Sequence, residues 1–101
     1  MHAEIDISVV IQLLNEERYV RDCIESLLSQ TYPKSRFEVI VIDNGSCDSS
    51  YAIVQEYPQV KLLSESEPGS YAARNRGILE ARGSVIAFID PDCLPDQNWL
   101  K

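Results

Sequence analysis

The chain has 101 residues, a length that suits one small domain, and its 45% hydrophobic and 25% charged residues are ordinary for a globular protein. Its formal net charge of −7 argues against nucleic acid or an anionic membrane surface as the main partner, because both require fields of Lys and Arg. An anionic substrate is compatible with this charge where a bound metal ion neutralises the site.

The first predicted strand covers residues 7–13 and is followed by a helix. Asn15 can cap that helix, with Glu16 and Glu17 in the favourable first turn. Pro33 is expected to stop it. Apolar side chains recur at helical spacing and predict one buried stripe, made of Val20, Cys23, Ile24, Leu27 and Leu28.

A second strand–helix unit follows. Residues 37–42 predict a strand that leads into a turn at residues 43–46. Ser46 or Asp48 can cap the next helix, which is expected to end before Pro58.

The third unit begins with a short strand at residues 60–63. A polar loop at residues 64–69 separates it from a helix that Ser70 can cap and that runs to about Ala81. Gly83 suits the left-handed position just beyond a helix end.

The last strand leads into the most informative feature of the chain. Residues 84–89 form an apolar run that predicts a strand buried on both faces, and the run ends at Asp90-Pro91-Asp92. Two carboxylates this close repel each other unless a cation lies between them, and oxygen ligands in a loop suit Mg²⁺ or Mn²⁺. The same residues would also make an ordinary turn, since Asp favours the first turn position and Pro the second.

This β-α-β-α-β-α-β order predicts an α/β fold with a parallel sheet. Every loop after a strand then opens on the same edge, so residues 13–15, 43–46, 64–70 and 90–92 should converge where open α/β sheets bind ligands. Residues 94–100 look like the start of another helix, whose Trp would pack on a part that follows. We therefore expect the N-terminal part of a larger domain.

The cysteines and the N-terminus indicate the compartment. Cys23, Cys47 and Cys93 are odd in number and no pair has the spacing of metal ligands, so we expect reduced thiols. The N-terminus has no basic segment of the kind that opens a signal peptide. These features predict a cytoplasmic protein, or one held at the cytoplasmic face of a membrane by parts outside this chain.

Five segments resemble the inverting glycosyltransferases of family 2, and the resemblance covers nearly the whole chain. A lone Asp-x-Asp motif would be weak evidence, but the segments occur in the family's order and at its separations. They are Ser8–Ile11 with Asn15–Glu17, Ser26–Pro33, Val41–Asp48, Ala73–Gly77 and Asp90–Asp92. The resemblance implies a three-layer α/β/α, Rossmann-like GT-A fold with a parallel sheet, truncated after the Asp-x-Asp motif.

The resemblance implies transfer of a sugar from a nucleoside-diphosphate-sugar donor, assisted by Mg²⁺ or Mn²⁺. The acceptor, a glycan, lipid or small molecule, is not identified. At the motif, Asp92 matches the position that contacts the metal bridging the diphosphate, and Asp90 matches one that faces the donor's ribose or the metal. The cation would also stabilise the leaving diphosphate as a Lewis acid.

Four further positions are assigned to the donor by the same resemblance. Asp43 and Asn44 match positions that read the nucleobase. Arg74 matches a position near the donor, and Leu13 ends the strand that borders it. From the residues alone, the segment at 43–46 could equally be a plain turn with a helix cap, and Arg74 a solvated helix charge.

The chain departs from the family pattern in three places. Gln12-Leu13-Leu14 stand where the family has Pro, a small residue and an aromatic or basic residue, so donor stacking or base choice should differ here. Cys93 stands where a further acidic residue is common. The family's catalytic base lies downstream, so we assign no catalytic residue and expect residues 1–101 to be a single donor-binding domain, inactive without the acceptor half.

Two consequences and two alternatives complete the prediction. Without further strands, a sheet edge and apolar surface should be exposed, which favours self-association. A non-catalytic nucleotide-binding or assembly module stays open as an alternative. A phosphoryl-transfer α/β domain fits less well, because it places its acidic pair after the first strand, where this chain has Leu13-Leu14-Asn15.

Overall fold

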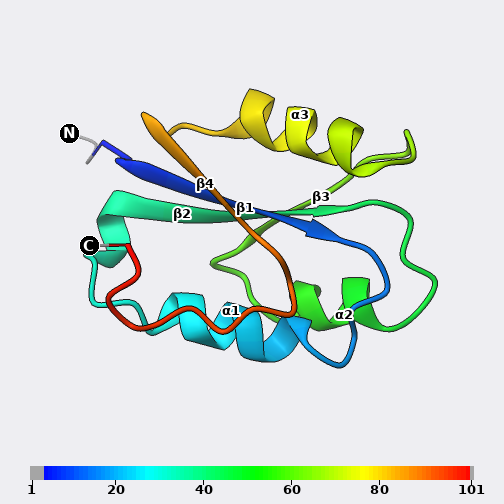
Figure 1. Cartoon of the computed structure of the whole chain (residues 1–101), viewed down its shortest axis with the longest axis horizontal. Helices are drawn as coiled ribbons and strands as arrows, with labels where there is room; N and C mark the ends of the chain where they lie inside the picture. Colours follow the sequence, from blue (N-terminus) through cyan, green and yellow to red (C-terminus); the bar gives the residue numbers. More distant parts are fainter. Residues whose placement is uncertain (1–3, 101) are drawn as a thin grey trace.

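A four-stranded parallel sheet lies between two layers of helices in the computed structural model, which describes residues 4–100 (Figure 1). The strands are β1 (Ile7–Leu13), β2 (Phe37–Asp43), β3 (Lys61–Ser64) and β4 (Val85–Ile89), in the spatial order β3-β2-β1-β4. The helices are α1 (Val20–Leu28), the short 3-10 turn η1 (Lys34–Arg36), α2 (Ser50–Gln55) and α3 (Ser70–Glu80). The predicted single domain also includes positions 1–3 and 101, which lie outside the described residues.

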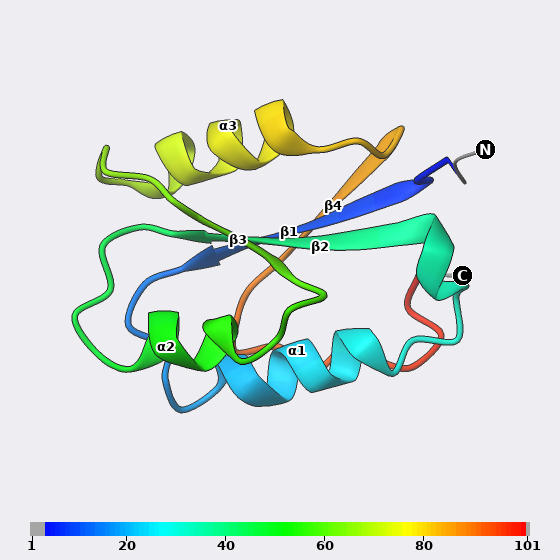
Figure 2. The ribbon, with the colours of Figure 1, turned by 180° about the vertical axis from the view of Figure 1, so that it is seen from behind.

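The two faces of the sheet are covered by different helices. Helices α1 and α2 lie against one face and α3 against the other, as the two opposite views show (Figures 1 and 2). The three-layer α/β/α prediction is therefore confirmed, and so are the four strands and their parallel pairing. Among the described residues, no helix combines the length and the apolar character that crossing a membrane would need.

The core is divided by the sheet because successive strand residues point to opposite faces. Val9, Ile11 and Leu13 of β1 pack on the side of α1, and Val10 packs toward α3 with Ile40, Ile42 and Ala73. The predicted stripe of α1 is confirmed, since Val20, Cys23, Ile24 and Leu27 are completely buried and Leu28 partly so. The paired central strands β1 and β2 thus form the rigid platform beneath the loops.

The prediction that the last strand is buried on both faces is wrong. Val85 and Phe88 of β4 are 56% and 44% exposed. The reason is the sheet order, because β4 is an edge strand that pairs with β1 alone. The apolar composition of β4 would suit a covered strand, but among the described residues no element covers it on its outer side.

The expected helix at residues 94–100 is also absent: residues 94–96 are irregular and residues 97–100 form a turn. The segment runs back along α1 (Figure 1). The amide of Gln30 donates from Nε2 to the carbonyl of Asp96 at 2.6 Å, and Leu100 N–H donates to Gln30 Oε1 at 3.1 Å. These bonds to Gln30, just beyond the end of α1, replace hydrogen bonds that a helix would have made within the segment.

Gly83 has a different purpose from the one its sequence position suggested. The left-handed glycines of the described residues are Gly45 and Gly69, and α3 ends in an extended Ala81. Gly83 instead packs directly on β1: its N–H donates to Ser8 Oγ at 2.8 Å. A Cβ at this position would lie 2.7 Å from the backbone nitrogen of Ser8, where no atom has room.

We therefore expect Gly83→Ala to lower the free energy of unfolding by about 1–3 kcal/mol, because the added methyl group overpacks the contact with β1. Urea unfolding measures the change. Ser84→Ala, at the exposed neighbouring position, is the control: the Ser84 hydroxyl makes only a long hydrogen bond of 3.4 Å to the Asp6 carbonyl, so stability should change by less than about 0.5 kcal/mol. Equal stability of the two variants would contradict the close approach.

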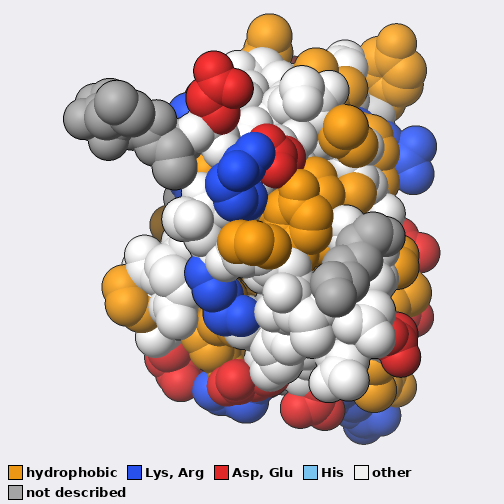
Figure 3. Space-filling model, turned by 90° about the vertical axis from the view of Figure 1, so that its left-hand side faces the viewer, with side chains coloured by type: hydrophobic (Ala, Val, Ile, Leu, Met, Phe, Trp, Pro, Cys, Tyr) orange, Lys and Arg blue, Asp and Glu red, His pale blue; other side chains and the backbone are white. Residues whose placement is uncertain are grey.

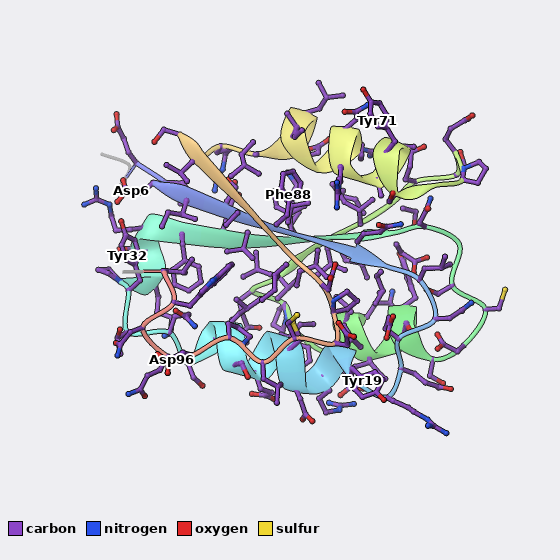
Figure 4. All side chains as sticks on the ribbon, in the orientation of Figure 1. Asp6, Tyr19, Tyr32, Tyr71, Phe88 and Asp96 are labelled. Atoms are coloured by element: carbon purple, nitrogen blue, oxygen red, sulfur yellow. The ribbon has the colours of Figure 1, made fainter. Side chains whose placement is uncertain are left out.

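A charged cluster closes the end of the sheet where the strands begin, the end seen in Figure 3, where acidic and basic side chains lie among hydrophobic ones. Asp6 and Tyr32 point toward each other in Figure 4, and the Tyr32 hydroxyl donates to Asp6 Oδ2 at 2.6 Å. Arg36 donates to Asp6 Oδ1 at 2.8 Å. The hydrogen bond from Arg36, followed by that from Tyr32, lowers the pKa of Asp6.

A carboxyl group with a lowered pKa in the folded state stabilises the fold at pH values above its ordinary pKa of about 3.9. That stabilisation is lost as the pH falls through the lowered value. We expect Asp6→Asn to reduce stability at pH 7 and to make the loss of stability toward about pH 2.5 less steep. Urea midpoints at both pH values test this, with Asp22→Asn on the exposed side of α1 as the control. An Asp6→Asn midpoint that falls as steeply as the wild type would contradict it.

Candidate functional site

The loops that follow the four strands lie at one edge of the sheet, as predicted. Hydrogen bonds join the loop after β1 to the loop after β2: Asn15 N–H donates to Ser46 Oγ at 3.0 Å, and Asn15 Oδ1 accepts from Cys47 N–H at 2.7 Å. Asn15 has a positive φ of 53° and does not cap α1, which begins only at Val20. Asn15, which was predicted to cap α1, instead joins the loop after β1 to the loop after β2.

Asp43 is the last residue of β2 and is only 7% exposed. One carboxylate oxygen, Oδ2, accepts a long hydrogen bond of 3.4 Å from Ser46 N–H. The other, Oδ1, is buried and has no hydrogen-bond partner among the described residues. A buried oxygen without a partner is costly and rare, and it marks the place where a donor from outside the chain would fit.

Asn44, the next residue, joins two loops, and its predicted contact with the nucleobase stays a prediction. Its Nδ2 donates to the carbonyls of Glu65 and Glu67 at 3.0 and 2.8 Å, and its Oδ1 accepts from Gly69 N–H at 3.1 Å. Both amide hydrogens are used, so the side chain has little left to offer a nucleobase. Asn44 holds the loop between β3 and α3 against the end of β2.

Leu13 stays a prediction for the donor site, but the structure leaves only its backbone for such a contact. Its side chain is completely buried in the core on the side of α1. Its carbonyl oxygen is also engaged, since it accepts from Asn44 N–H at 2.9 Å. The reason is the strand period, which directs residue 13 inward and leaves its neighbour Leu14 exposed at the site.

The acidic motif forms a tight turn at the end of β4. Cys93 N–H donates to the Asp90 carbonyl at 3.0 Å, with Pro91 buried at the second position of the turn. The turn and the metal-site interpretations are therefore compatible. Asp90, Asp92 and Cys93 are all exposed, and one ligand atom from each lies within 4.8 Å of the others. Two carboxylates and a thiol are a donor set that fits a divalent cation.

A pocket of about 340 Å³ connects this turn with the end of β1. Its lining includes Glu16 and Leu14 together with Asp90 and Asp92. Sequence reasoning assigned Glu16 to the first turn of a helix and missed this position. A third carboxylate near the acidic pair increases the negative charge of the pocket, which favours a cation. Because α1 begins only at Val20, Glu16 lies in the loop after β1 and not in a helix, and this loop places it at the sheet edge.

A second pocket, of about 460 Å³, lies on the other side of the turn. Arg74 of α3 extends over the ring of Phe88, with its guanidinium carbon 5.6 Å from the ring centroid. Both side chains line this pocket with Asp90, Cys93 and Trp99. The structure thus brings Arg74 to the acidic turn, while the aromatic lining from Phe88 and Trp99 was not predicted as part of a site.

Cys23 lies beneath the turn, with its sulfur 3.8 Å from the carbonyl oxygen of Asp90. Burial, with smaller contributions from Cys93 and Asp92, raises the pKa of the Cys23 thiol to about 12. Cys23 is therefore an unreactive packing residue, as the apolar stripe of α1 predicted.

Known proteins resemble this chain in sequence and in structure. The sequence profile described as Glycosyl transferase family 2 matches residues 8–101. Glycosyltransferase AglE of Haloferax volcanii is 45% identical over 100 residues, which is 94% of this chain and 33% of AglE. The chain therefore spans about a third of the length of this relative.

Solved structures agree with the sequence match. The crystal structure of S. aureus TarS in complex with UDP superposes with a TM-score of 0.89 at 30% identity, covering 95% of this chain and 30% of TarS. The mannosyltransferase PcManGT from Pyrobaculum calidifontis, solved with GDP-Man and Mn²⁺, gives a TM-score of 0.84 at 25% identity, covering 92% of this chain and 29% of PcManGT. On the evidence of profile, relatives and fold, the chain belongs to glycosyltransferase family 2 and corresponds to the N-terminal portion of its GT-A enzymes.

Proposed function

We propose that this chain binds a nucleoside-diphosphate-sugar donor and is the donor-binding half of a metal-dependent, inverting glycosyltransferase. One observation carries the proposal: the same sheet edge holds a buried acceptor without a partner, Asp43 Oδ1, and an exposed acidic turn at Asp90–Asp92. The complexes of TarS with UDP and of PcManGT with GDP-Man and Mn²⁺ support it. The acceptor is an unidentified glycan, lipid or small molecule.

Asp43 would recognise the nucleobase. A carboxylate oxygen accepts hydrogen bonds and donates none, and we propose that Asp43 Oδ1 accepts from a ring N–H of the base. Uracil and thymine offer N3–H, and guanine offers N1–H, whereas cytosine presents an acceptor at N3. The buried position of Oδ1 strengthens this preference, because a base without a donor there would leave the oxygen without a hydrogen bond, which costs free energy of binding. Asn44 would contribute to donor binding indirectly, by holding the loop after β3 in place.

The diphosphate would lie at the other end of the site. β2 and β4 flank β1, so at about 4.8 Å per strand their ends are about 10 Å apart, which leaves room for a ribose between base and diphosphate. Asp92 and Asp90 would hold Mg²⁺ or Mn²⁺. When bound, the cation neutralises the diphosphate and stabilises it as a leaving group. Arg74 would add a fixed positive charge from α3 beside Asp90.

The residues that activate an acceptor are not assigned. A catalytic base has to reach the acceptor hydroxyl within hydrogen-bond distance. Among residues 4–100 we assign none to this role, because the carboxylates at the site edge would be occupied with the cation. We therefore propose that residues 1–101 supply donor binding only.

The exposed free thiols of Cys47 and Cys93 suit a reducing, cytoplasmic environment.

Calorimetric titration with UDP, GDP, dTDP and CDP, each with and without Mn²⁺, tests the proposal. We expect UDP, GDP or dTDP to bind only when Mn²⁺ is present, and CDP to bind at least about tenfold more weakly than the preferred nucleotide. The strongest ligand identifies the base of the natural donor. Absence of binding for all four nucleotides, with circular dichroism demonstrating a folded chain, would overturn donor binding by this chain.

We also propose that the exposed edge of β4 pairs two copies of the chain. Val85 N–H donates to Asp6 O toward β1, so alternation directs the backbone groups of Ile86 and Phe88 outward. Unpaired edges of this kind add strands. Light scattering should show an apparent mass that rises with concentration, and Val85→Lys, a charge on the edge, should abolish the rise. A wild-type monomer over a wide concentration range would contradict the pairing.

A further inference from the structure

Cys93 lies within the acidic turn, and its thiol is a third potential ligand there. The hydrogen bond from Cys93 N–H to the Asp90 carbonyl brings the first and fourth residues of the turn together. The sulfur lies 3.9 Å from Oδ1 of Asp92, and the ligand atoms of all three residues lie within 4.8 Å of one another. All three side chains are exposed, so a cation can reach them.

The spacing fits coordination of one ion. Metal–sulfur bonds are about 2.3 Å and metal–oxygen bonds about 2.0–2.2 Å, so sulfur and oxygen on one tetrahedral ion lie about 3.6 Å apart. The observed 3.9 Å between Cys93 and Asp92 reaches this value with a small side-chain rotation. A carboxylate at position 93 would have kept the ligand set all-oxygen, whereas the thiol makes it mixed.

This inference rests on the proposed donor site. We propose that Cys93 ligates the cation held by Asp90 and Asp92, and that it shifts the site's preference toward thiophilic divalent ions such as Zn²⁺ and Co²⁺ and away from Mg²⁺. Thiolate is a soft ligand that selects ions of the first kind, while carboxylate and water suit Mg²⁺ and Mn²⁺. On binding, a metal–sulfur bond replaces the S–H bond and the proton leaves to solvent.

The other two thiols allow the signal to be assigned. Cys47 is exposed like Cys93, but it lies in the loop after β2 and outside the cluster, so Cys47→Ser is the matched control. Cys23 is completely buried in α1 and no ion can approach its sulfur from solvent. Its replacement would open a cavity in the core, so it is left in place in every variant.

The experiment is a titration of the chain with Co²⁺ and Cd²⁺, alone and with UDP, followed by ultraviolet sulfur-to-metal charge-transfer absorption. Wild type and Cys47→Ser should both develop this absorption, and Cys93→Ser should not. Competition with Mg²⁺ gives the preference: Cys93→Ser should lose about tenfold or more in Co²⁺ affinity while its Mg²⁺ affinity stays within about twofold. Asp92→Ala should weaken both ions.

The outcomes separate this inference from the proposed function. Mn²⁺-dependent UDP binding that needs Asp92, without charge-transfer absorption, would overturn sulfur ligation and leave the donor site intact. Absorption that survives Cys93→Ser or disappears in Cys47→Ser would overturn the assignment to Cys93. If neither ions nor UDP bind to the folded chain, both the donor site and the thiol ligand are wrong.

Discussion

Replacing Asp92 by alanine should reduce Mn²⁺-dependent nucleotide binding at least about 100-fold while leaving the chain folded. Loss of an outer-shell partner of a metal site already costs 10- to 100-fold, and Asp92 is proposed to touch the ion directly. Its side chain is exposed, and its one described contact is the weak one to the Cys93 thiol. The fold therefore loses almost nothing with it. Calorimetry with UDP measures the affinity, and urea unfolding measures the stability.

Asp96→Ala is the matched control for this experiment. It removes the same charge from an exposed position, but Asp96 lies on the segment that returns along α1 (Figure 4) and is neither in the acidic cluster nor in the lining of its pocket. At physiological ionic strength a charge beyond about 8 Å is largely screened, so UDP affinity should change less than about twofold. Equal affinities of Asp92→Ala and wild type would remove Asp92 from the site. Equal losses in both variants would indicate a general effect of charge.

Asp43→Asn should separate binding from stability. The free protein should be as stable as the wild type or more stable by up to about 1–3 kcal/mol, because the buried carboxylate oxygen without a partner becomes a neutral amide. UDP affinity should fall roughly 10- to 100-fold, because the amide oxygen is expected to stay toward Ser46 N–H, which leaves the NH₂ group, a donor only, facing N3–H. CDP should gain relative to UDP, because the new donor matches the acceptor at cytosine N3.

A carboxylate with partners provides the contrast. Asp48 Oδ1 accepts from Ser50 N–H at 2.9 Å and its Oδ2 accepts from Glu17 N–H at 3.2 Å. Hydrogen bonding by the Ser50 side chain, with a smaller contribution from its backbone N–H, lowers the pKa of Asp48. Asp48→Asn should therefore lower stability and leave the UDP-to-CDP ratio unchanged. Urea unfolding and calorimetry on the two variants together decide the matter, and a UDP affinity of Asp43→Asn equal to wild type would contradict the base contact.

The arrangement of the fold could be predicted from local patterns. Apolar strands alternating with amphipathic helices predicted the parallel sheet, and a parallel sheet places every loop after a strand at one edge. Asp43 and the Asp90–Asp92 turn follow strands directly, so their place at that edge could be predicted too. Such patterns are short-range, and they describe each strand without describing its neighbours.

What could not be predicted depends on contacts between distant residues. The exposure of β4 follows from its place at the sheet edge, which its own apolar sequence does not encode. The bonds of Asn44 go to residues 21 to 25 positions away, and those of Asn15 to residues 31 and 32 positions away. A residue type that suits helix caps and turns equally well serves here to join loops. The inward direction of Leu13 was available from strand alternation and was overlooked.

The packed core and the proposed binding site are built largely from different residues, which affects how the site can change in evolution. The strands and helices carry the packed core, while Asp43 is the last residue of β2, and Glu16 and the acidic turn lie on loops that contribute little to the core. Substitutions in these loops can therefore change the nucleotide or the ion without disturbing the scaffold. The likeness to proteins solved with UDP and with GDP-Man is what such a scaffold permits. Substitutions in a single loop can therefore change which ligand binds at this sheet edge while the other loops keep their contacts.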